Sequence, residues 1–488
     1  MTWIPSLQMR LFAFFGTVVY CFSVLGQLTW QRTYGAYSTE EGNSVVVLDD
    51  GYMVVGSTGS FGAGSGDIYV LKLTLEGERA WSRTLGGNGV DQGRQVKATS
   101  DGGFIVAGFT NSSGNGGYDG YLAKLNSDGW PIWERTFGGS DWDFFHSVIE
   151  RPDGGFMAAG ETFSNGSGDS DAWLVHVSDD GDLIWEDQYG GIEGDLARSI
   201  IHCSSGGYLF AGETTVGGDQ DAWIVRVDDA GGTLWTSTQG GDSLDIVNSV
   251  VETIDGGFAA VGTTKSFNTV TEAYHFKVDV TGVLVWEWNW GQVNDQESFD
   301  VKELPDGRLL STGYVTSGGS GGRDMFIFFT LSDGSFERGV SNGGDDGEGD
   351  EVGSGLALTP DGGSIHCGST TSFGFGPKDA YVVKTNDTGW TATSAVVDVF
   401  DPVGVMDRQQ VHAVSLFPNP ASATCRLTTG DPLASATLFD PQGRLVRTWS
   451  APIPQELDLR GLAEGTYQFV AIGDDGRRMA LPLMIAGN

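Results

Sequence analysis

A motif of about 50 residues recurs seven times between residues 30 and 390. In each copy a Trp-bearing segment ends in glycine, an acidic residue follows, and an Asp-Gly or similar turn opens an apolar run. A last segment begins with an acidic residue and usually ends in a basic one. The Trp position is occupied in turn by Trp30, Trp81, Trp133, Trp185, Trp235, Trp286 and Phe336, with Trp390 near an eighth. Repeats of this length are typical of propellers, solenoids and arrays, so the period constrains the fold more than composition does.

Each copy predicts four short antiparallel strands. In residues 91–138 the pattern alternates over 95–99, and a tight turn leads into a continuous apolar run over 104–108, typical of a strand buried on both faces. Two further strands are expected over 121–125 and 132–136, and no segment has a helical period. Four short strands per repeat describe one propeller blade, so we expect an all-β chain with a seven-bladed β-propeller over residues 27–390.

The Trp series has one more member than the series of turns. The segment at Trp30 keeps most of the motif, whereas the chain after Trp390 loses it. We therefore expect the Trp30 segment to supply the outer strand of the last blade, which closes the ring and leaves no open edge. With these anchors, residues 30–390 resemble bacterial β-propeller repeats with a consensus near "DGGyivaGst…gGsDaylvKld.nGnvlWsktyGG". The resemblance implies the fold and no particular activity.

Both ends of the chain predict export. Residues 1–26 have one charge, Arg10, before an apolar run over 11–25, which predicts a signal peptide cleaved after Gly26. The alternative, an uncleaved anchor, needs about 20 apolar residues, more than the run supplies. No later segment is apolar enough to span a membrane, so no transmembrane segment is expected after signal removal.

Residues 411–488 abandon the repeat and predict short strands between Pro and Gly turns, a small C-terminal β-sandwich. They resemble the C-terminal sorting domain of the type IX secretion system, type A-like, through residues Pro418, Asn419, Pro420, Asp440, Gly443, Gly465 and Tyr467. The resemblance implies export across the outer membrane by the type IX secretion machinery, and a secreted or cell-surface location. Residues 391–410 are the expected linker. The alternative is a generic accessory sandwich.

Composition limits the partners. The net charge is −37, and nearly all of the excess lies in the repeat region, so nucleic acid and anionic membranes are not expected partners. Three cysteines remain after signal removal, Cys203, Cys367 and Cys425. Their odd number and wide spacing predict buried thiols rather than disulfides or a zinc site.

An acidic residue precedes the expected inner strand of each repeat, and we expect these acids to form a ring at the mouth of the central channel. The set is Glu40, Asp91, Asp143, Asp195, Asp245, Asp295 and Glu348. Oxygen ligands in such numbers suit Ca²⁺, although no cofactor is required. The simpler interpretation is that each carboxylate accepts hydrogen bonds from loop amides, and recurs because the loop recurs.

Binding is expected where the repeats differ, in the long loops that share one face of the ring. The most suggestive segment holds Trp142, Asp143, Phe144, Phe145 and His146, since exposed aromatic side chains beside carboxylates suit sugar stacking or protein contact. The alternative is that both Phe side chains pack between blades. The six histidines form no Ser/His/Asp or metal-ligand pattern, and no residue is assigned to catalysis. The sequence thus predicts a non-catalytic binding or adhesion module for an extracellular glycan or protein. The alternatives are a polysaccharide hydrolase or lyase acting in the propeller mouth, and a structural surface scaffold.

Overall fold

The computed structural model describes residues 27–291, 294–316, 322–344, 349–391, 396–400, 415–417, 421–428, 433–439, 444–473 and 478–485. The predicted signal peptide lies outside these ranges. The chain divides into two compact units, Met1–Val403 and Gly404–Asn488. The described residues contain strands and no helix, which confirms the all-β prediction, and accordingly they include no helix that could cross a membrane.

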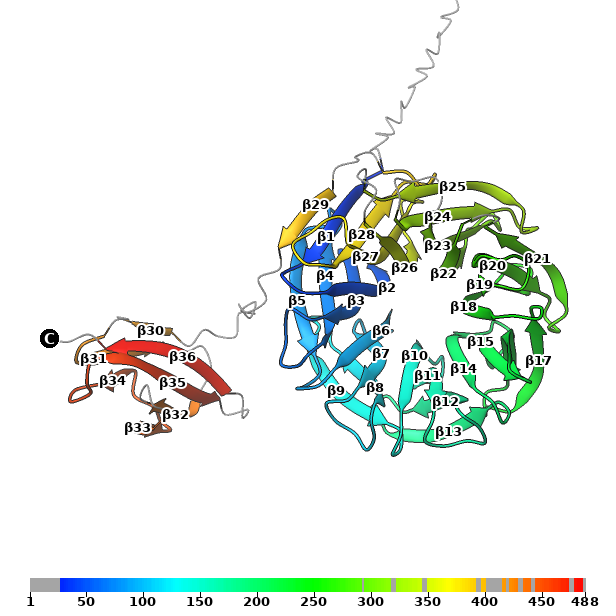
Figure 1. Cartoon of the computed structure of the whole chain (residues 1–488). Helices are drawn as coiled ribbons and strands as arrows, with labels where there is room; N and C mark the ends of the chain where they lie inside the picture. Colours follow the sequence, from blue (N-terminus) through cyan, green and yellow to red (C-terminus); the bar gives the residue numbers. More distant parts are fainter. Residues whose placement is uncertain are drawn as a thin grey trace, which may run out of the picture. The chain divides into compact units, whose positions relative to one another are not determined.

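The first unit is a propeller of antiparallel sheets whose innermost strands surround a central axis (Figure 1). Six of its sheets are built from consecutive strands, and a seventh combines strands from both ends of the unit. The first three sheets are β2 (Glu40–Leu48), β3 (Gly51–Thr58), β4 (Asp67–Thr74), β5 (Arg79–Leu85); β6 (Asp91–Ala98), β7 (Phe104–Thr110), β8 (Asp119–Leu125), β9 (Pro131–Phe137); and β10 (Asp143–Glu150), β11 (Phe156–Thr162), β12 (Asp171–Val177), β13 (Leu183–Tyr189). The next three are β14 (Asp195–His202), β15 (Tyr208–Val216), β16 (Asp219–Val227), β17 (Thr233–Gln239); β18 (Asp245–Glu252), β19 (Phe258–Thr264), β20 (Glu272–Val278), β21 (Leu284–Trp290); and β22 (Gln296–Glu303), β23 (Leu309–Val315), β24 (Asp324–Thr330), β25 (Phe336–Asn342).

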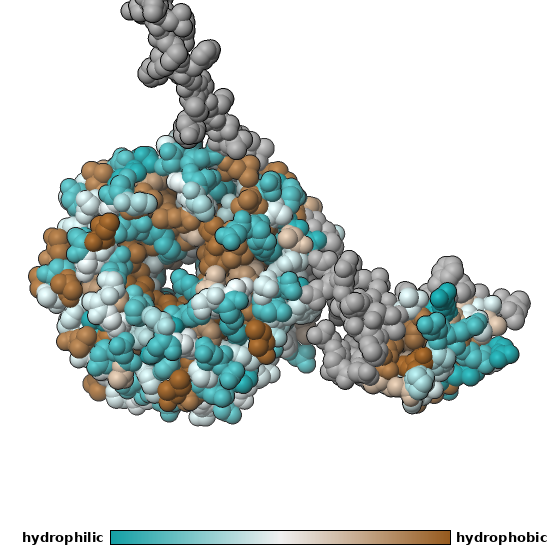
Figure 2. Space-filling model, turned by 180° about the vertical axis from the view of Figure 1, so that it is seen from behind, coloured by the Kyte–Doolittle hydropathy of each residue, from teal (hydrophilic) through white to brown (hydrophobic). Residues whose placement is uncertain are grey.

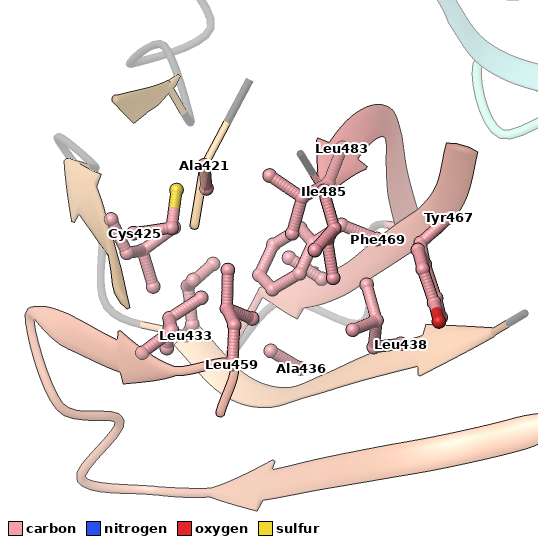
Figure 3. Packing of buried hydrophobic residues seen from close by; sticks show 13 residues of the cluster. Ala421, Cys425, Leu433, Ala436, Leu438, Leu459, Tyr467, Phe469, Leu483 and Ile485 are labelled. Carbon is pink, nitrogen blue, oxygen red and sulfur yellow. The ribbon is translucent and has the colours of Figure 1, made fainter. Parts of the chain in front are cut away.

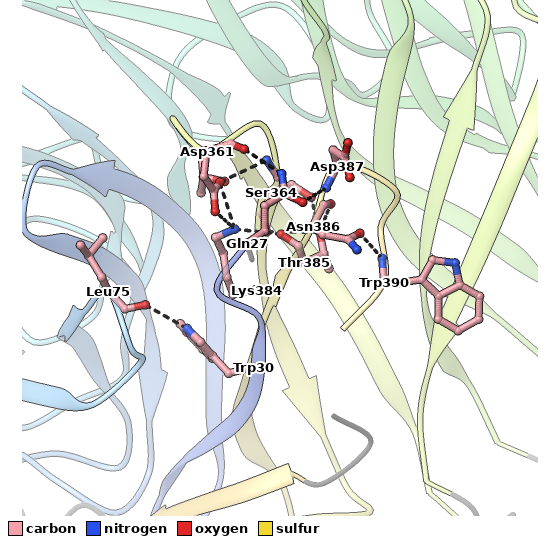
Figure 4. Close-up of polar contacts among 12 residues, drawn as sticks. Gln27, Trp30, Leu75, Asp361, Ser364, Lys384, Thr385, Asn386, Asp387 and Trp390 are labelled. Atoms are coloured by element: carbon pink, nitrogen blue, oxygen red, sulfur yellow. Dashed lines mark hydrogen bonds and ion pairs between the residues drawn. The ribbon is translucent and has the colours of Figure 1, made fainter. Parts of the chain in front are cut away.

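The seventh sheet joins the two ends of the ring, in the order β26 (Glu351–Leu358), β27 (Ser364–Thr370), β28 (Asp379–Thr385), β1 (Trp30–Gly35), β29 (Val396–Phe400). Strand β1 is antiparallel to β28, with Trp30 opposite Lys384, so the expected closure by the Trp30 segment is confirmed. The Gln27 side chain reinforces it, donating to the Asp361 carbonyl at 2.7 Å and accepting from the Asp387 amide at 3.0 Å (Figure 4). Trp390 is 60% exposed and belongs to no strand.

Strand β29 lies inside residues 391–410, which the sequence predicts to be a linker without a strand. It pairs with β1 in parallel, from Gln31 opposite Val396 to Gly35 opposite Phe400. Without β29, the outer edge of β1 would present unpaired backbone groups, which favour association with other strands. The residues after Trp390 therefore extend the closing sheet for five positions.

The recurring Trp is explained by a contact between neighbouring sheets. Each Trp on an outer strand covers the hairpin turn of the next sheet, where a glycine has positive φ: Gly181 (φ +79°) lies under Trp133, and a Cβ there would meet the ring at 2.9 Å. The indole Nε1 of Trp133 also donates to the Asp179 carbonyl of the same turn at 2.8 Å. Trp30, Trp81, Trp235 and Trp286 meet Gly77, Gly129, Gly282 and Gly334 in the same way. The motif thus encodes attachment of each sheet to the next.

A second recurring contact is an ion pair between the Asp of the Asp-Gly turn and the basic residue near the end of the third strand. The Lys124 ammonium lies 2.8 Å from the Asp101 carboxylate, and Lys277 lies 2.7 Å from Asp255. Hydrogen bonding to the lysine is the largest cause that lowers the pKa of Asp101 to about 2. This ion pair ties the turn between the first two strands to the third strand.

The core lies between adjacent sheets as well as within them. One cluster combines Val55 and Val70 from one sheet with Val106 and Tyr121 from the next. Cys203 and Cys367 are fully buried in such clusters and Cys425 is buried in the second unit, which confirms the prediction of free, buried thiols. Burial raises the pKa of Cys203 to about 12, so this thiol stays protonated.

The second unit has two sheets with a shared core, a small β-sandwich (Figure 3). The sheets are β30 (Ser415–Phe417), β31 (Thr424–Thr428), β34 (Glu456–Asp458), and β33 (Leu445–Ser450), β32 (Leu433–Phe439), β35 (Gly465–Gly473), β36 (Arg478–Ile485). Of the expected sorting motif, Gly465 begins β35, and the buried Tyr467 donates to the Ala463 carbonyl at 2.9 Å. The motif residues Pro418, Asn419, Pro420, Asp440 and Gly443 lie outside the described residues.

Candidate functional site

Five of the seven acids of the predicted ring are buried in the loops and do not line the channel. Glu40, Asp91, Asp143, Asp195 and Asp245 each begin an inner strand and are at most 1% exposed. Their carboxylates turn into the loops of the long-loop face. Asp143, for example, accepts from the Gly139 amide at 2.8 Å and from the Ser164 hydroxyl at 2.7 Å. This geometry supports the loop-stabilising interpretation of the acids.

Two members of the predicted ring were misplaced by the alignment of the motif. Asp295 is exposed and precedes β22, whose first residue is Gln296. Glu348 lies outside the described residues, and the equivalent buried position in β26 is Glu351, which accepts from the Thr370 hydroxyl at 2.6 Å. The segment before β26 is longer than in the other repeats, so counting from the glycine pair placed the acid three residues early.

A second set of acids begins the third strands and also holds loops. Asp67 accepts from the amides of Ala63 and Gly64, and Asp379 accepts from the Gly376 amide at 2.8 Å. Burial raises the pKa of Asp379 to about 6, and one of its carboxylate oxygens, Oδ1, is buried without a partner. Within the described ranges, no group of three or more His, Cys, Asp or Glu side chains is arranged to hold a metal ion.

The predicted binding segment, residues 142–146, has both exposed and buried aromatic side chains. Phe145 is fully buried and stacks on Trp173 with a centroid separation of 4.7 Å, as the between-blade interpretation predicts. Trp142 is 50% exposed, and Phe144 turns away from the core to lie beside it. Two adjacent residues of one strand point to opposite faces, so the two Phe side chains have different roles.

Trp142 and Phe144 belong to an aromatic cluster on the long-loop face, and we use that name for Phe109, Tyr118, Trp142, Phe144 and Phe163. The residues come from two neighbouring sheets and their long loops. Phe144 lies at its centre, with ring centroids 4.9 Å from Phe109, 5.7 Å from Tyr118 and 6.5 Å from Phe163. Backbone bonds from Asp143 to Tyr118 and from Phe163 to Trp142 fix the loops. The aromatic cluster is therefore a built surface with two strongly exposed members, Trp142 and Phe163.

The central channel is lined by residues that the motif gave no reason to select. The fourth residue of each innermost strand sits at a β-bulge, where the pairing register shifts. A bulge leaves the extra residue unpaired and redirects its side chain. These channel residues are Asn43, Arg94, His146, Arg198, Asn248, Phe299 and Ser354, and they line a cavity of about 340 Å³. The ring is hollowed at its centre in Figure 2.

The residues that follow the bulge connect the sheets around the channel. The Ser147 hydroxyl accepts from the Ile200 amide at 3.1 Å, and the Gln95 side chain accepts from the Val148 amide at 2.7 Å. Asp300 accepts from the Ser249 hydroxyl and from the Leu356 amide, at 2.8 and 2.9 Å. These hydrogen bonds connect the innermost strands of different sheets, and they fix the positions of the neighbouring channel residues.

Of the predicted site residues that the structure describes, only His146 lines the channel. Its Nε2 is 3.7 Å from the Glu161 carboxylate, and burial lowers the pKa of His146, against the opposing effect of Glu161. His146 also stacks near Phe144, with centroids 6.5 Å apart. The aromatic cluster and the channel are thereby continuous.

Two buried Ser–His contacts resemble parts of a catalytic triad but lack its other requirements. His275 Nε2 is 2.8 Å from the Ser298 hydroxyl, and His366 Nε2 is 2.8 Å from that of Ser364. In both histidines Nδ1 has no partner among the described residues, and all four side chains are at most 1% exposed. A triad needs an acid at the second ring nitrogen and access for substrate, so neither pair is a nucleophile site.

No family model and no curated protein matches the chain. Among solved structures, it is similar to the extracellular domain of a putative hybrid two-component system from B. thetaiotaomicron, with 10% identity and a TM-score of 0.43 over 92% of this chain and 57% of that one. The chain thus spans little more than half of that domain. It is also similar to the Pan2 WD40 domain of Neurospora crassa (10% identity, TM-score 0.46, 75% and 99% covered) and to a Bacteroides caccae protein of unknown function (14%, 0.36, 62% and 94%). At these scores the fold assignment rests on the strand pairing described above.

Proposed function

We propose that the protein is an extracellular, non-catalytic binding module that holds a glycan on its aromatic cluster. The observation that carries this proposal is the exposure of Trp142 and Phe163, at 50% and 39%, on a surface of five packed aromatic rings. Contiguous exposed aromatic side chains on a soluble protein mark binding sites, because leaving them in water is unfavourable.

Polar groups around the aromatic cluster suit a sugar. Ser113, Asn115 and Asp141 are exposed on the adjoining loops and offer donors and acceptors to ring hydroxyls. The loops themselves are held by buried acids, such as Asp119, which accepts from the Asn115 amide at 3.2 Å. The surface is therefore preorganised, which reduces the entropy lost on binding.

The proposed location and export route rest on the sequence. The apolar segment over residues 11–25 supports entry into the periplasm, and the resemblance of residues 411–488 to a sorting domain supports export by type IX secretion. Deleting residues 411–488 should trap the protein in the periplasm, as measured by surface labelling and fractionation. Normal surface display of the truncated chain would contradict the route.

Binding is tested by a glycan array with the purified mature chain, followed by calorimetry on the best neutral ligand. Trp142→Ala should weaken that ligand by roughly thirtyfold or more, since truncating a central aromatic anchor costs about 2 kcal/mol. Trp390→Ala is the matched control, because Trp390 is also exposed and lies outside the aromatic cluster. Equal affinity of Trp142→Ala and the unaltered chain would refute the proposed surface. Release of cleaved product from any glycan would favour the hydrolase or lyase alternative.

A further inference from the structure

The channel contains two cations that form no ion pair with any described residue. The Arg94 guanidinium has no hydrogen bond or ion pair to any described residue, and its Nε is buried without an acceptor. The Lys97 ammonium, three residues along the same strand, likewise has no such partner among the described residues and lines the same cavity. Both side chains are partly buried in the channel wall, where an opposite charge would stabilise them.

The neighbouring charges do not supply the missing partners. Arg198 is held by Glu213, with two of its nitrogens 2.9–3.0 Å from one carboxylate oxygen, and Lys302 lies 2.6 Å from Asp300. Glu41 is engaged by Lys378 at 2.9 Å. Glu161 approaches His146 rather than Arg94.

Across the ring on β22, Glu297 accepts from the hydroxyls of Tyr314 and Thr263. The unpaired positive charge is therefore concentrated on the β6 side of the channel.

The basic side chains also lie next to one another. Arg94, His146 and Arg198 occupy the same bulge position on the inner strands of three consecutive sheets. The positive charges of Arg94 and Arg198 both act on His146. Arg94 additionally places its guanidinium 5.2 Å from the ring centroid of Phe109, a member of the aromatic cluster. An anionic group at this point would contact the aromatic cluster and the arginine together.

We propose that the channel mouth binds the carboxylate of an acidic sugar, with Arg94 as its principal partner and Lys97 as the cation below it. This inference rests on the proposed glycan function and specifies the ligand as a uronic-acid glycan. The planar guanidinium suits a carboxylate, since it offers parallel N–H donors to both oxygens. The uncharged faces of the sugar rings lie on the aromatic cluster. The cations of the channel mouth favour ligands that carry a carboxylate.

The test compares trigalacturonate with its trimethyl ester, which has the same sugar chain and no charge, by calorimetry on the full mature chain. The unaltered protein should bind the acid at least tenfold more tightly than the ester. Arg94→Gln should weaken the acid by roughly tenfold to a hundredfold, the range for one charge-assisted hydrogen bond, and leave the ester unchanged. Arg135→Gln, on the exposed β9 strand, is the matched control and should change neither.

A thermal unfolding midpoint for each variant verifies folding. If Arg94→Gln does not fold, Arg94→Lys, which keeps the charge without the planar donor pair, should still reduce the preference for the acid. No preference in the unaltered protein, or a preference unchanged in the Arg94 variants, overturns the inference.

The outcomes separate this inference from the proposed function. Loss of both ligands in Trp142→Ala supports the aromatic cluster, whether or not Arg94 contributes. Loss of the acid in Arg94→Gln, with Trp142→Ala binding normally, keeps the anion site and refutes the aromatic surface. Acetate or free galacturonate binding as tightly as trigalacturonate would show a site for small carboxylates and overturn the glycan assignment.

Discussion

The contact between Trp133 and Gly181 makes a quantitative prediction about how the sheets are attached. Gly181 has φ of +79°, where an alanine costs about 1–2 kcal/mol in backbone strain. Its Cβ would also lie 2.9–3.0 Å from three atoms of the Trp133 ring, below the roughly 3.5–4.0 Å optimum for carbon contacts. Displacing that ring adds about 1–3 kcal/mol, so Gly181→Ala should destabilise the propeller by about 2–5 kcal/mol.

Gly102 provides the matched control for the backbone strain of an alanine at positive φ. Its φ is +83°, and a Cβ there would meet no atom within 4 Å. Gly102→Ala should therefore cost only the strain of about 1–2 kcal/mol. The difference between the two alanine variants isolates the contact with Trp133.

A double-mutant cycle then tests whether the ring is the cause. Trp133→Ala alone should cost about 3–5 kcal/mol, and in its background the extra cost of Gly181→Ala should fall to the strain alone. Urea unfolding of the full chain, followed by far-ultraviolet circular dichroism, gives the four stabilities. The reasoning is refuted if Gly181→Ala costs no more than Gly102→Ala, or if its extra cost persists without the ring.

Three further predictions concern the acids and the overall charge. Asp91→Ala removes the acceptor of one loop amide and two hydroxyls, and should destabilise the propeller by about 2–4 kcal/mol in urea unfolding; a change below about 0.5 kcal/mol would contradict the loop-stabilising role. Because burial raises the pKa of Asp379 from 3.8 to about 6, its contribution to stability is complete below pH 3.8 and is lost as pH rises through 6. Asp379→Asn should remove this loss, and melting temperatures that fall equally in both proteins between pH 4 and 7.5 would contradict it. Because the chain carries a net charge of −37, association with trigalacturonate should accelerate between 10 and 150 mM salt in stopped-flow measurements, and a slower rate would contradict long-range repulsion.

The repeated parts of the fold could be predicted because their causes are local. A glycine with positive φ that meets a Trp on the previous outer strand recurs at most of the hairpins that pack against the neighbouring sheet. Trp30 could be assigned to the closing sheet by counting alone, and its pairing with β28 confirms the assignment. Strand β29 could not be predicted, since its pairing depends on the free edge that β1 leaves and not on any pattern in Val396–Phe400.

The candidate site was predicted less completely, for two physical reasons. Loops of unequal length moved the acid of the last repeat from the expected Glu348 to Glu351, where the strand begins. The bulge in each inner strand changes the alternation of side chains, so counting by twos does not show that Arg94 and Arg198 face the channel. One feature of the sequence could have identified the channel residues: the seven repeats have different residues at the fourth position of the inner strand.

That disagreement follows from what each position contacts. A residue that holds a loop or a neighbouring sheet meets the same surroundings in every repeat, so the same side chain serves each time. The channel residues do not share one partner: Asn43 and Asn248 each donate to a backbone carbonyl on a neighbouring inner strand, at 2.8 and 2.9 Å, whereas Arg198 is held by Glu213. Arg94 is the extreme case, since its guanidinium has no ion-pair partner among the described residues and would be paired by the carboxylate of the proposed glycan. Binding in this propeller is therefore expected at positions where the seven repeats have different residues. Arg94 and Lys97 on β6, which form no ion pair with the described residues, are the clearest example.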